Sequence, residues 1–190
     1  MLLPPRSLRA EPASLAGCYE LFPSVRRDAR GLFVKTFHEE IYSAAHLATR
    51  FAEEYYSISK RRVLRGLHFQ VPPHEHAKLV YCTHGEVLDV VVDLRVGSPT
   101  FSRHQIFRLG GRRRNILYIP VGFAHGFYVM SASATLVYKT TSVHSEDHDR
   151  GVRWDSAGIP WSDPDPIVSD RDRSLPPLPE FQSPFRYDAL

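Results

Sequence analysis

The sequence contains little cysteine, no long apolar run and no marked excess of charge of either sign. Two cysteines, Cys18 and Cys82, are too few for a disulfide framework, which favours a reducing, cytoplasmic location. No apolar stretch approaches the roughly 20 residues of a membrane-spanning helix. Pro4 and Pro5 interrupt the apolar start of the chain, so we expect neither a membrane segment nor a secretory signal. A net charge of +3 is too small to indicate a nucleic-acid partner.

What the sequence does contain is enough apolar material for one core. The chain has 190 residues, of which 43% are hydrophobic, and this predicts a single domain over residues 1–190. Between about residues 53 and 145, runs rich in β-branched residues alternate with turn signals at a spacing of roughly 8–12 residues. Residues 87–94 and 134–141 are examples. This spacing favours an antiparallel sandwich or jelly roll over β–α–β units.

Two segments outside this β-rich core have different patterns. Apolar residues recur at near-helical spacing from Phe37 to Phe51, which predicts one helix there. After Gly151, seven prolines break any long element. We therefore expect residues 151–190 to form an irregular arm against the barrel rather than a second domain.

Four polar side chains stand inside apolar, strand-like segments: Arg65, His68, Lys78 and Tyr138. Burying an ionisable group is costly unless the group is paired or neutral. Each residue alone is explained by a satisfied core network, whereas the four together predict a polar interior that serves a function. In an extended strand Arg65 and His68 point to opposite faces. Their convergence requires a bulge or bend, and Gly66 is the permissive position for one.

Three histidines raise a metal site as an alternative. His74, His76 and His125 resemble in their spacing the ligands of metal-binding cupins, which need three or four nitrogen and oxygen donors around one ion. The carboxylate that usually completes such a set does not follow His76, and Pro72-Pro73 place the first two histidines in a turn. The pattern therefore favours a site without metal.

Longer motifs make the sequence resemble one known family. Residues 63–70 (VLRGLHFQ), 85–95 (GEVLDVVVDLR) and 119–127 (IPVGFAHGF), followed by Tyr138-Lys139, closely resemble the dTDP-4-dehydrorhamnose 3,5-epimerase family. The resemblance covers about residues 20–175. It implies an all-β, cupin-type double-stranded jelly-roll barrel with one or two short helices. It also implies a homodimer without metal or cofactor, acting on a nucleoside-diphosphate 4-keto-6-deoxyhexose in deoxysugar biosynthesis.

The chemistry of that family gives each buried polar group a role. A ketone at C4 acidifies the C3–H and C5–H bonds, because the resulting carbanion delocalises onto oxygen as an enolate. Epimerisation then needs a base on one face of the ring, an acid on the other and positive charge near the ketone oxygen. By resemblance His68 is the base, with Asp172 as its carboxylate partner, and Tyr138 is the acid. Lys78 corresponds to the cation at the C4 oxygen.

The resemblance also implies a set of substrate-binding residues, some of which depart from the family pattern. Glu53-Glu54-Tyr55 stands where members typically carry Gln-Asp-Asn, and Val143-His144 replaces a pair of tyrosines. The nucleobase, and the choice between epimerisation at C3, at C5 or at both, therefore stay open. The implied set is Arg30, Phe33, Glu53, Tyr55, Arg65, His125, His144, Asp149 and Arg171.

Three hypotheses of different classes follow. The first is an epimerase of a nucleotide-linked 4-ketosugar, including the variant that acts at only one carbon or on a differently based nucleotide. The second is a metal-dependent cupin that uses the three histidines named above. The third is a sugar-nucleotide binding module that keeps the barrel without the chemistry.

Overall fold

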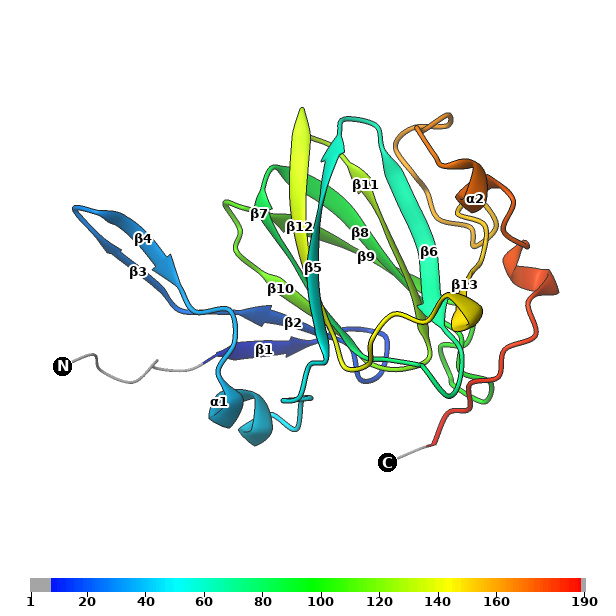
Figure 1. Ribbon diagram of the computed structural model, residues 1–190, viewed down its shortest axis with the longest axis horizontal. Coiled ribbons are helices and arrows are strands. Elements are labelled where there is room, and N and C mark those ends of the chain that lie inside the picture. Colours follow the sequence, from blue (N-terminus) through cyan, green and yellow to red (C-terminus); the bar gives the residue numbers. More distant parts are fainter. Residues whose placement is uncertain (1–7, 189–190) are drawn as a thin grey trace.

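Two antiparallel sheets carry the fold (Figure 1). The computed structural model describes residues 8–188. The six-stranded sheet has the order β1 (Arg9–Pro12), β2 (Tyr19–Phe22), β10 (Ile116–Ile119), β7 (Lys78–His84), β12 (Ser133–Thr140), β5 (Glu53–Lys60). The five-stranded sheet has the order β13 (Asp149–Gly151), β6 (Leu64–Gln70), β11 (Phe123–Val129), β8 (Glu86–Asp93), β9 (His104–Gly110).

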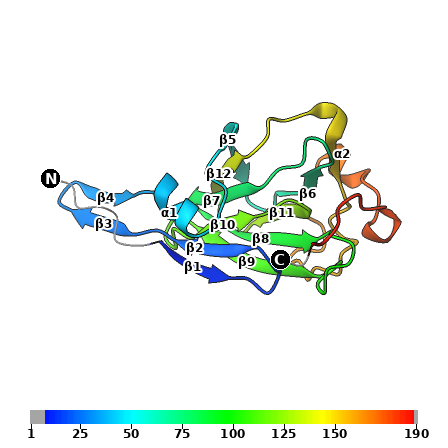
Figure 2. The same cartoon turned by 90° about the horizontal axis from the view of Figure 1, so that it is seen from below.

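The remaining elements are short. β3 (Val25–Asp28) and β4 (Gly31–Val34) form a hairpin of their own, which projects from one side of the sheets (Figures 1 and 2). The two α-helices are α1 (Glu39–Ala44) and α2 (Asp170–Arg173), and 3-10 turns occupy Glu146–His148 and Leu178–Glu180. Within residues 8–188, no helix is long and apolar enough to cross a membrane.

The core lies between the two sheets, which pack face to face. Val80 and Leu136 of the six-stranded sheet belong to the same buried cluster as Val91 and Phe127 of the five-stranded sheet. Alternate residues of each strand point into this layer, as the period of an extended chain requires. The expected all-β jelly roll is thus confirmed, with two open sheets facing each other rather than one closed barrel.

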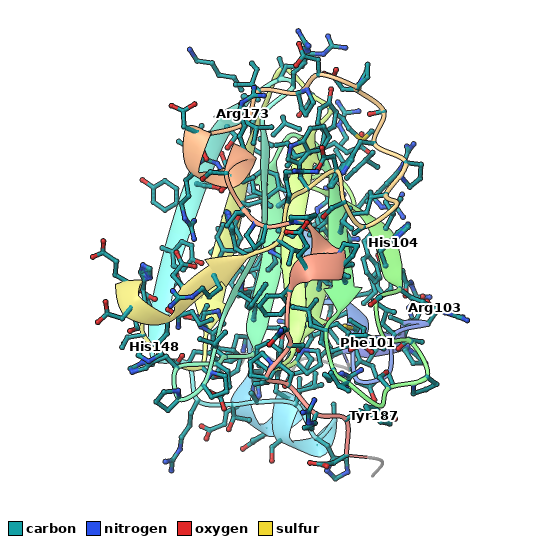
Figure 3. All side chains as sticks on the ribbon, turned by 90° about the vertical axis from the view of Figure 1, so that its right-hand side faces the viewer. Phe101, Arg103, His104, His148, Arg173 and Tyr187 are labelled. Carbon is teal, nitrogen blue, oxygen red and sulfur yellow. The ribbon has the colours of Figure 1, made fainter. Side chains whose placement is uncertain are left out.

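The outer face of the five-stranded sheet is also apolar, and the C-terminal part of the chain covers it. Val90 and Val92 point away from the core cluster and pack instead in a second cluster with Ile159 and Phe185. This explains why β8 reads as an almost continuous apolar run, since both faces of the strand are buried. Figure 3 shows the chain beyond β13 crossing this side of the molecule.

The helix expected between Phe37 and Phe51 is much shorter than the apolar pattern suggested. Only Glu39–Ala44 is helical, and no side chain caps its first turn. The apolar residues around it pack as a loop against the six-stranded sheet: Phe37, Phe51 and Leu47 join Leu79 in one cluster. Their spacing therefore reflects tertiary packing, which satisfies the same apolar positions without a continuous helix.

A bulge in β6 brings Arg65 and His68 to the same side, as the alternation of the strand required. His68 pairs with His125 and Arg65 pairs with Phe127, so β6 advances one residue more than β11 between these pairs. Gly66 carries this irregularity with φ +132°, and a Cβ there would lie 2.5 Å from the Cα of Gly126. Only glycine fits so close a backbone approach.

Candidate active site

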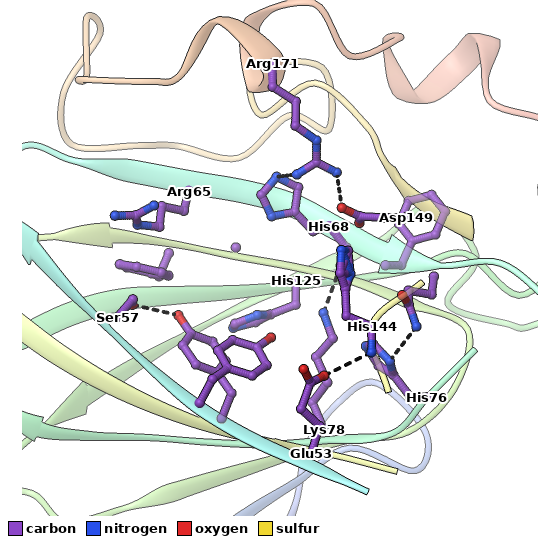
Figure 4. A pocket seen from close by; sticks show the side chains of 16 residues that line it. Glu53, Ser57, Arg65, His68, His76, Lys78, His125, His144, Asp149 and Arg171 are labelled. Carbon is purple, nitrogen blue, oxygen red and sulfur yellow. Dashed lines mark hydrogen bonds and ion pairs between the residues drawn. The ribbon is translucent and has the colours of Figure 1, made fainter. Parts of the chain in front are cut away.

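A cavity of about 400 Å³ between the sheets gathers most of the predicted site residues. This volume falls in the range of small-molecule sites, roughly 300–1,000 Å³. Figure 4 shows the labelled side chains turned toward this common space from both sheets. Ten of the thirteen predicted residues line it: Glu53, Tyr55, Arg65, His68, Lys78, His125, Tyr138, His144, Asp149 and Arg171.

His68 on β6 forms a dyad with Asp172 on α2. Nε2 of His68 lies 2.7 Å from Oδ1 of Asp172, although 103 residues separate the two in the chain. A carboxylate accepts hydrogen bonds, so Nε2 carries the ring proton and Nδ1 carries the lone pair. His68 lines the main cavity, while Asp172 lies behind it and lines a neighbouring one. The imidazole is thus held in the tautomer of a base.

The backbone holds Asp172 as a carboxylate. The N–H of Gly66 donates to Oδ2 at 3.1 Å, and Ser169 caps α2 by accepting from the N–H of Asp172 at 3.1 Å. Burial alone would raise the pKa of Asp172, but the hydrogen bonds from His68 and Gly66 outweigh it and lower the pKa below its ordinary value. The bulge at Gly66 therefore serves the dyad as well as the strand.

Tyr138 on β12 presents its phenol to the same cavity. Its hydroxyl lies 3.4 Å from the hydroxyl of Ser57, and its ring stacks on Tyr55 with centroids 4.8 Å apart. Burial raises the pKa of Tyr138 far above its ordinary value, so the phenol is protonated at neutral pH. The side chain is therefore fixed in position and able to donate a proton.

Lys78, at the start of β7, is a buried cation. Its side chain donates from Nζ to the backbone oxygen of His68 at 3.2 Å. Burial lowers the pKa of Lys78 to about 8, and the carboxylates of Asp149 and Asp89 oppose that effect. The ammonium group is thus charged at neutral pH and lies next to the base.

A second histidine–carboxylate pair closes the floor of the cavity. Nε2 of His125 lies 2.9 Å from both carboxylate oxygens of Asp89, and both residues are buried. Burial raises the pKa of Asp89, and the hydrogen-bonded His125 partly offsets this. The pair orients His125 toward the cavity.

Charged residues on loops and strand ends complete the walls. Arg171 donates to Asp149 at 2.6 Å, and its other terminal nitrogen approaches Nε2 of His68 at 3.4 Å. Glu53 accepts from the backbone N–H of His144 at 3.0 Å. These pairs join the arm, β13 and β5 around the cavity.

Two predicted residues, Arg30 and Phe33, lie elsewhere. Both belong to the β3–β4 hairpin and line a separate cavity made by that hairpin alone. Arg30 pairs with Asp28 at 2.6 Å, and the Phe33 side chain is mostly exposed. Within one chain, therefore, these two residues do not reach the site of His68 and Tyr138.

The three histidines of the metal hypothesis each contact a different partner. His125 pairs with Asp89, His76 lies 3.1 Å from the side-chain amide of Gln70, and His74 packs against His148. In the part of the chain that the structure describes, no group of three or more His, Cys, Asp or Glu side chains is placed to hold a metal ion.

Sequence reasoning missed several residues of the cavity. Ser57 and Gln70 line it, and Asp89 supports it from behind. Asp89 carried a detectable signal, because a carboxylate inside the apolar run of residues 87–92 requires a buried partner. Ser57 and Gln70 gave no such signal in the sequence, since uncharged polar residues in strands are common.

The fold and the site together define a class of protein. A histidine backed by a carboxylate, a protonated phenol and a buried ammonium group meet at one cavity of a cupin-like jelly roll, an arrangement that suits acid–base chemistry. The model of the dTDP-4-dehydrorhamnose 3,5-epimerase family matches residues 12–180. The chain belongs to that family, and it is therefore an isomerase.

Individual relatives agree with this family. The chain is 41% identical over 153 residues to a dTDP-4-dehydrorhamnose 3,5-epimerase of Shigella flexneri, covering 79% of this chain and 84% of that protein. A dTDP-4-dehydrorhamnose 3-epimerase of Streptomyces niveus is 37% identical over 169 residues, with 87% and 82% covered. The crystal structure of a dTDP-6-deoxy-D-glucose-3,5-epimerase from Legionella pneumophila, in complex with dTDP-4-keto-L-rhamnose, matches with a TM-score of 0.91 at 32% identity, covering 96% and 100%.

Proposed function

We propose that this protein epimerises a nucleoside-diphosphate 4-keto-6-deoxyhexose at C3, C5 or both by removing and returning protons. The observation that carries the proposal is the shared cavity of His68 and Tyr138, a base and an acid on its walls. Family membership supports the reaction, and the nucleotide-linked ketosugar bound by the Legionella relative supports the substrate class.

In the proposed reaction, Nδ1 of His68 takes a proton from a carbon next to the ketone. The electron pair of that C–H bond moves into a carbon–carbon double bond and leaves the C4 oxygen as an enolate. The Lys78 ammonium group donates a hydrogen bond to this oxygen, where negative charge develops. Tyr138 then protonates the carbon from the opposite face, which inverts it. Solvent returns His68 and Tyr138 to their starting protonation states.

The surroundings of each group suit that role. Asp172 fixes the His68 tautomer and stabilises the imidazolium that forms. Stacking on Tyr55 and the contact with Ser57 keep the Tyr138 hydroxyl at one place. The remaining cavity residues, Arg65, His125 and Arg171 among them, supply donors for the hydroxyls and phosphates of the substrate.

The experiment that tests the function follows solvent hydrogen into the sugar. The purified protein is incubated in D₂O with dTDP-, UDP- and GDP-linked 4-keto-6-deoxyglucose, and deuterium at C3 and C5 is measured by NMR and mass spectrometry. We expect incorporation at one or both carbons, and the labelled position identifies a 3-epimerase, a 5-epimerase or a 3,5-epimerase. Binding without any incorporation would leave the protein a binding module and contradict the proposal.

The charge of Lys78 predicts an alkaline limit to the reaction. Its pKa of about 8 means that the ammonium is charged below that pH and neutral above it. We therefore expect kcat/KM, which reports the free enzyme, to fall as the pH rises through about 8. Lys78→Arg keeps the positive charge, so its kcat/KM should be lower than that of the wild type but should not fall as the pH rises through 8. A wild-type profile that stays flat to pH 9.5 would contradict the role of Lys78.

We also propose that the protein forms a homodimer in which the β3–β4 hairpin reaches a second copy. Leu32 and Phe33 expose 50% and 58% of their surfaces on this projecting element. Apolar side chains exposed on a protruding hairpin are typical of an interface. In such a dimer, Arg30 and Phe33 of one chain would reach the cavity of the other. The family resemblance assigns both residues to substrate binding.

Phe33→Glu tests this arrangement. We expect it to shift the protein from dimer to monomer in sedimentation velocity and to raise the KM by tenfold or more, because a charge would be buried at the interface. Phe101→Glu is the matched control, since Phe101 is similarly exposed, at 42%, in the loop between β8 and β9 rather than on the hairpin. A Phe33→Glu variant with the oligomeric state and KM of the control would contradict the proposal.

A further inference from the structure

One polar group on the wall of the cavity has no part in the chemistry above. His76 lines the cavity, yet its Nε2 is buried and has no hydrogen-bond partner among the described residues. A buried nitrogen without a partner is costly, and a folded protein tolerates one chiefly where something else meets it. The atom therefore requires an explanation.

The contacts of Nδ1 favour the tautomer of His76 that carries its proton on Nε2. Nδ1 lies 3.1 Å from Nε2 of Gln70. The Gln70 side chain is oriented by the backbone N–H of Ser145, which donates to its oxygen at 2.6 Å, so the amide nitrogen faces His76 and can only donate. Nδ1 also lies 3.3 Å from the hydroxyl of Ser142, and the Gln70 amide nitrogen donates to the backbone oxygens of His74 and Val143 as well. An unprotonated Nδ1 can accept from Gln70 or Ser142, whereas a protonated Nδ1 would face the Gln70 amide nitrogen, which cannot accept. We therefore assign the ring proton to Nε2, so the unpartnered atom is a hydrogen-bond donor.

The ring is also neutral. Burial, together with the nearby Lys78 and His144, lowers the pKa of His76 to about 3. A neutral imidazole donates one hydrogen bond without placing a second cation next to Lys78. It keeps that property throughout the physiological pH range.

His76 lies just before β7 and lines the same cavity as Lys78, the first residue of that strand. Val80 pairs with Tyr138 and Lys78 pairs with Thr140, and the ladder continues where Ala77 and Thr141 exchange hydrogen bonds. His76 is two residues before Lys78, outside the strand, and Lys78 is among the groups that lower its pKa. Figure 4 shows it with His144 and Glu53 at the end of the cavity away from Ser57 and Arg65.

We infer that His76 is a specificity-determining residue whose Nε2–H donates to an acceptor oxygen of the bound nucleotide sugar. The inference rests on the proposed function for the identity of that ligand. The acceptor belongs either to the sugar beyond the ketone or to the nucleotide, and both offer oxygens of the same chemistry. A site that reserves a buried donor for a substrate oxygen rejects analogues that lack it.

Three variants separate this role from a packing role. His76→Phe removes the donor and keeps the ring, while His76→Gln returns an N–H donor. His74→Phe is the control, because His74 packs against His148 outside the cavity and its backbone oxygen, which Gln70 and Ser142 use, is unaffected. For each variant, KM and kcat are measured with the dTDP-linked 4-ketosugar, dTDP binding by calorimetry, and the melting temperature by calorimetric scanning.

We expect His76→Phe to raise KM about fivefold to twentyfold with kcat changed less than threefold, as for one lost neutral hydrogen bond. His76→Gln should recover part of this loss, and the control should match the wild type. If dTDP affinity falls equally, the acceptor is on the nucleotide; if it is unchanged, the acceptor is on the sugar. Equal KM and dTDP affinity in wild type and His76→Phe overturn the inference, as does a KM effect that His76→Gln does not relieve.

A direct measurement on the wild type adds a test independent of catalysis. Long-range ¹H–¹⁵N NMR of ¹⁵N-histidine-labelled protein should show the His76 ring neutral and protonated on Nε2 from pH 8 down to pH 5.5. A ring proton on Nδ1 would overturn the inference. Because dTDP binding and the ring tautomer need no turnover, a wild type that fails to exchange deuterium would refute the proposed function without deciding the role of His76.

Discussion

His68→Asn is expected to reduce both epimerisation and solvent-deuterium incorporation by about 10²- to 10⁴-fold, the usual contribution of a positioned general base. The asparagine amide cannot accept a proton from carbon, and the other histidine of the cavity that is paired with a carboxylate, His125, is buried against Asp89. His68 is only partly buried, so the substitution should leave the fold intact. Rates are measured by NMR at saturating substrate.

Asp172→Asn separates the base from its partner. It leaves the imidazole in place but removes the charge that stabilises the imidazolium, and it allows the wrong tautomer. We expect a smaller loss than for His68→Asn, and the double variant should be no slower than His68→Asn alone, because the two residues act as one unit. His74→Asn, a histidine outside the cavity, is the control. Retention of more than a tenth of wild-type exchange by His68→Asn would mean that another group is the base.

Tyr138→Phe should have a different signature, because it removes the acid and keeps the base. We expect epimerisation to fall by about 10²- to 10³-fold. Deuterium incorporation with retention of configuration should persist, since His68 can still remove a proton and return a deuteron on the same face. The phenyl ring preserves the stacking on Tyr55 and loses only the contact with Ser57.

The control for this experiment is Tyr55→Phe, which removes the neighbouring phenol of the stacked pair. Burial raises the pKa of Tyr55 to about 12, so this hydroxyl is also protonated at neutral pH and must be excluded as the donor. Tyr55→Phe should keep inversion at a kcat close to that of the wild type, with any loss confined to KM, because Tyr55 belongs to the expected substrate-binding set. If Tyr55→Phe loses inversion and Tyr138→Phe keeps it, the acid has been assigned to the wrong tyrosine.

The sequence predicts much of the fold because strand alternation is local. The turn spacing indicates the jelly roll, and the opposite directions of Arg65 and His68 in an extended strand indicate the bulge at Gly66. The helix between Phe37 and Phe51 was wrong in extent, because apolar residues three and four apart pack equally well as a loop against a sheet. Local periodicity does not distinguish these cases when the sheet supplies the contacts.

The sequence predicts those site residues that are polar or charged within an apolar strand. His68, Lys78 and Tyr138 are conspicuous as polar groups in apolar strands. Asp172 is one charge among several in a proline-rich segment, and only the family resemblance linked it to His68. The long-range pairing that joins them is a property of the folded arm. The unpartnered nitrogen of His76 is likewise invisible in the sequence, because it depends on how Gln70 is oriented.

The carboxylate of the base belongs to the arm and not to the two sheets. Asp172 sits on α2 and reaches back to the strand bulge through the N–H of Gly66. A nascent or nicked chain whose sheets have closed but whose last segment is undocked would hold an imidazole with neither a fixed tautomer nor a counter-ion. We therefore expect reactivity to require the docked arm as well as the completed sheets.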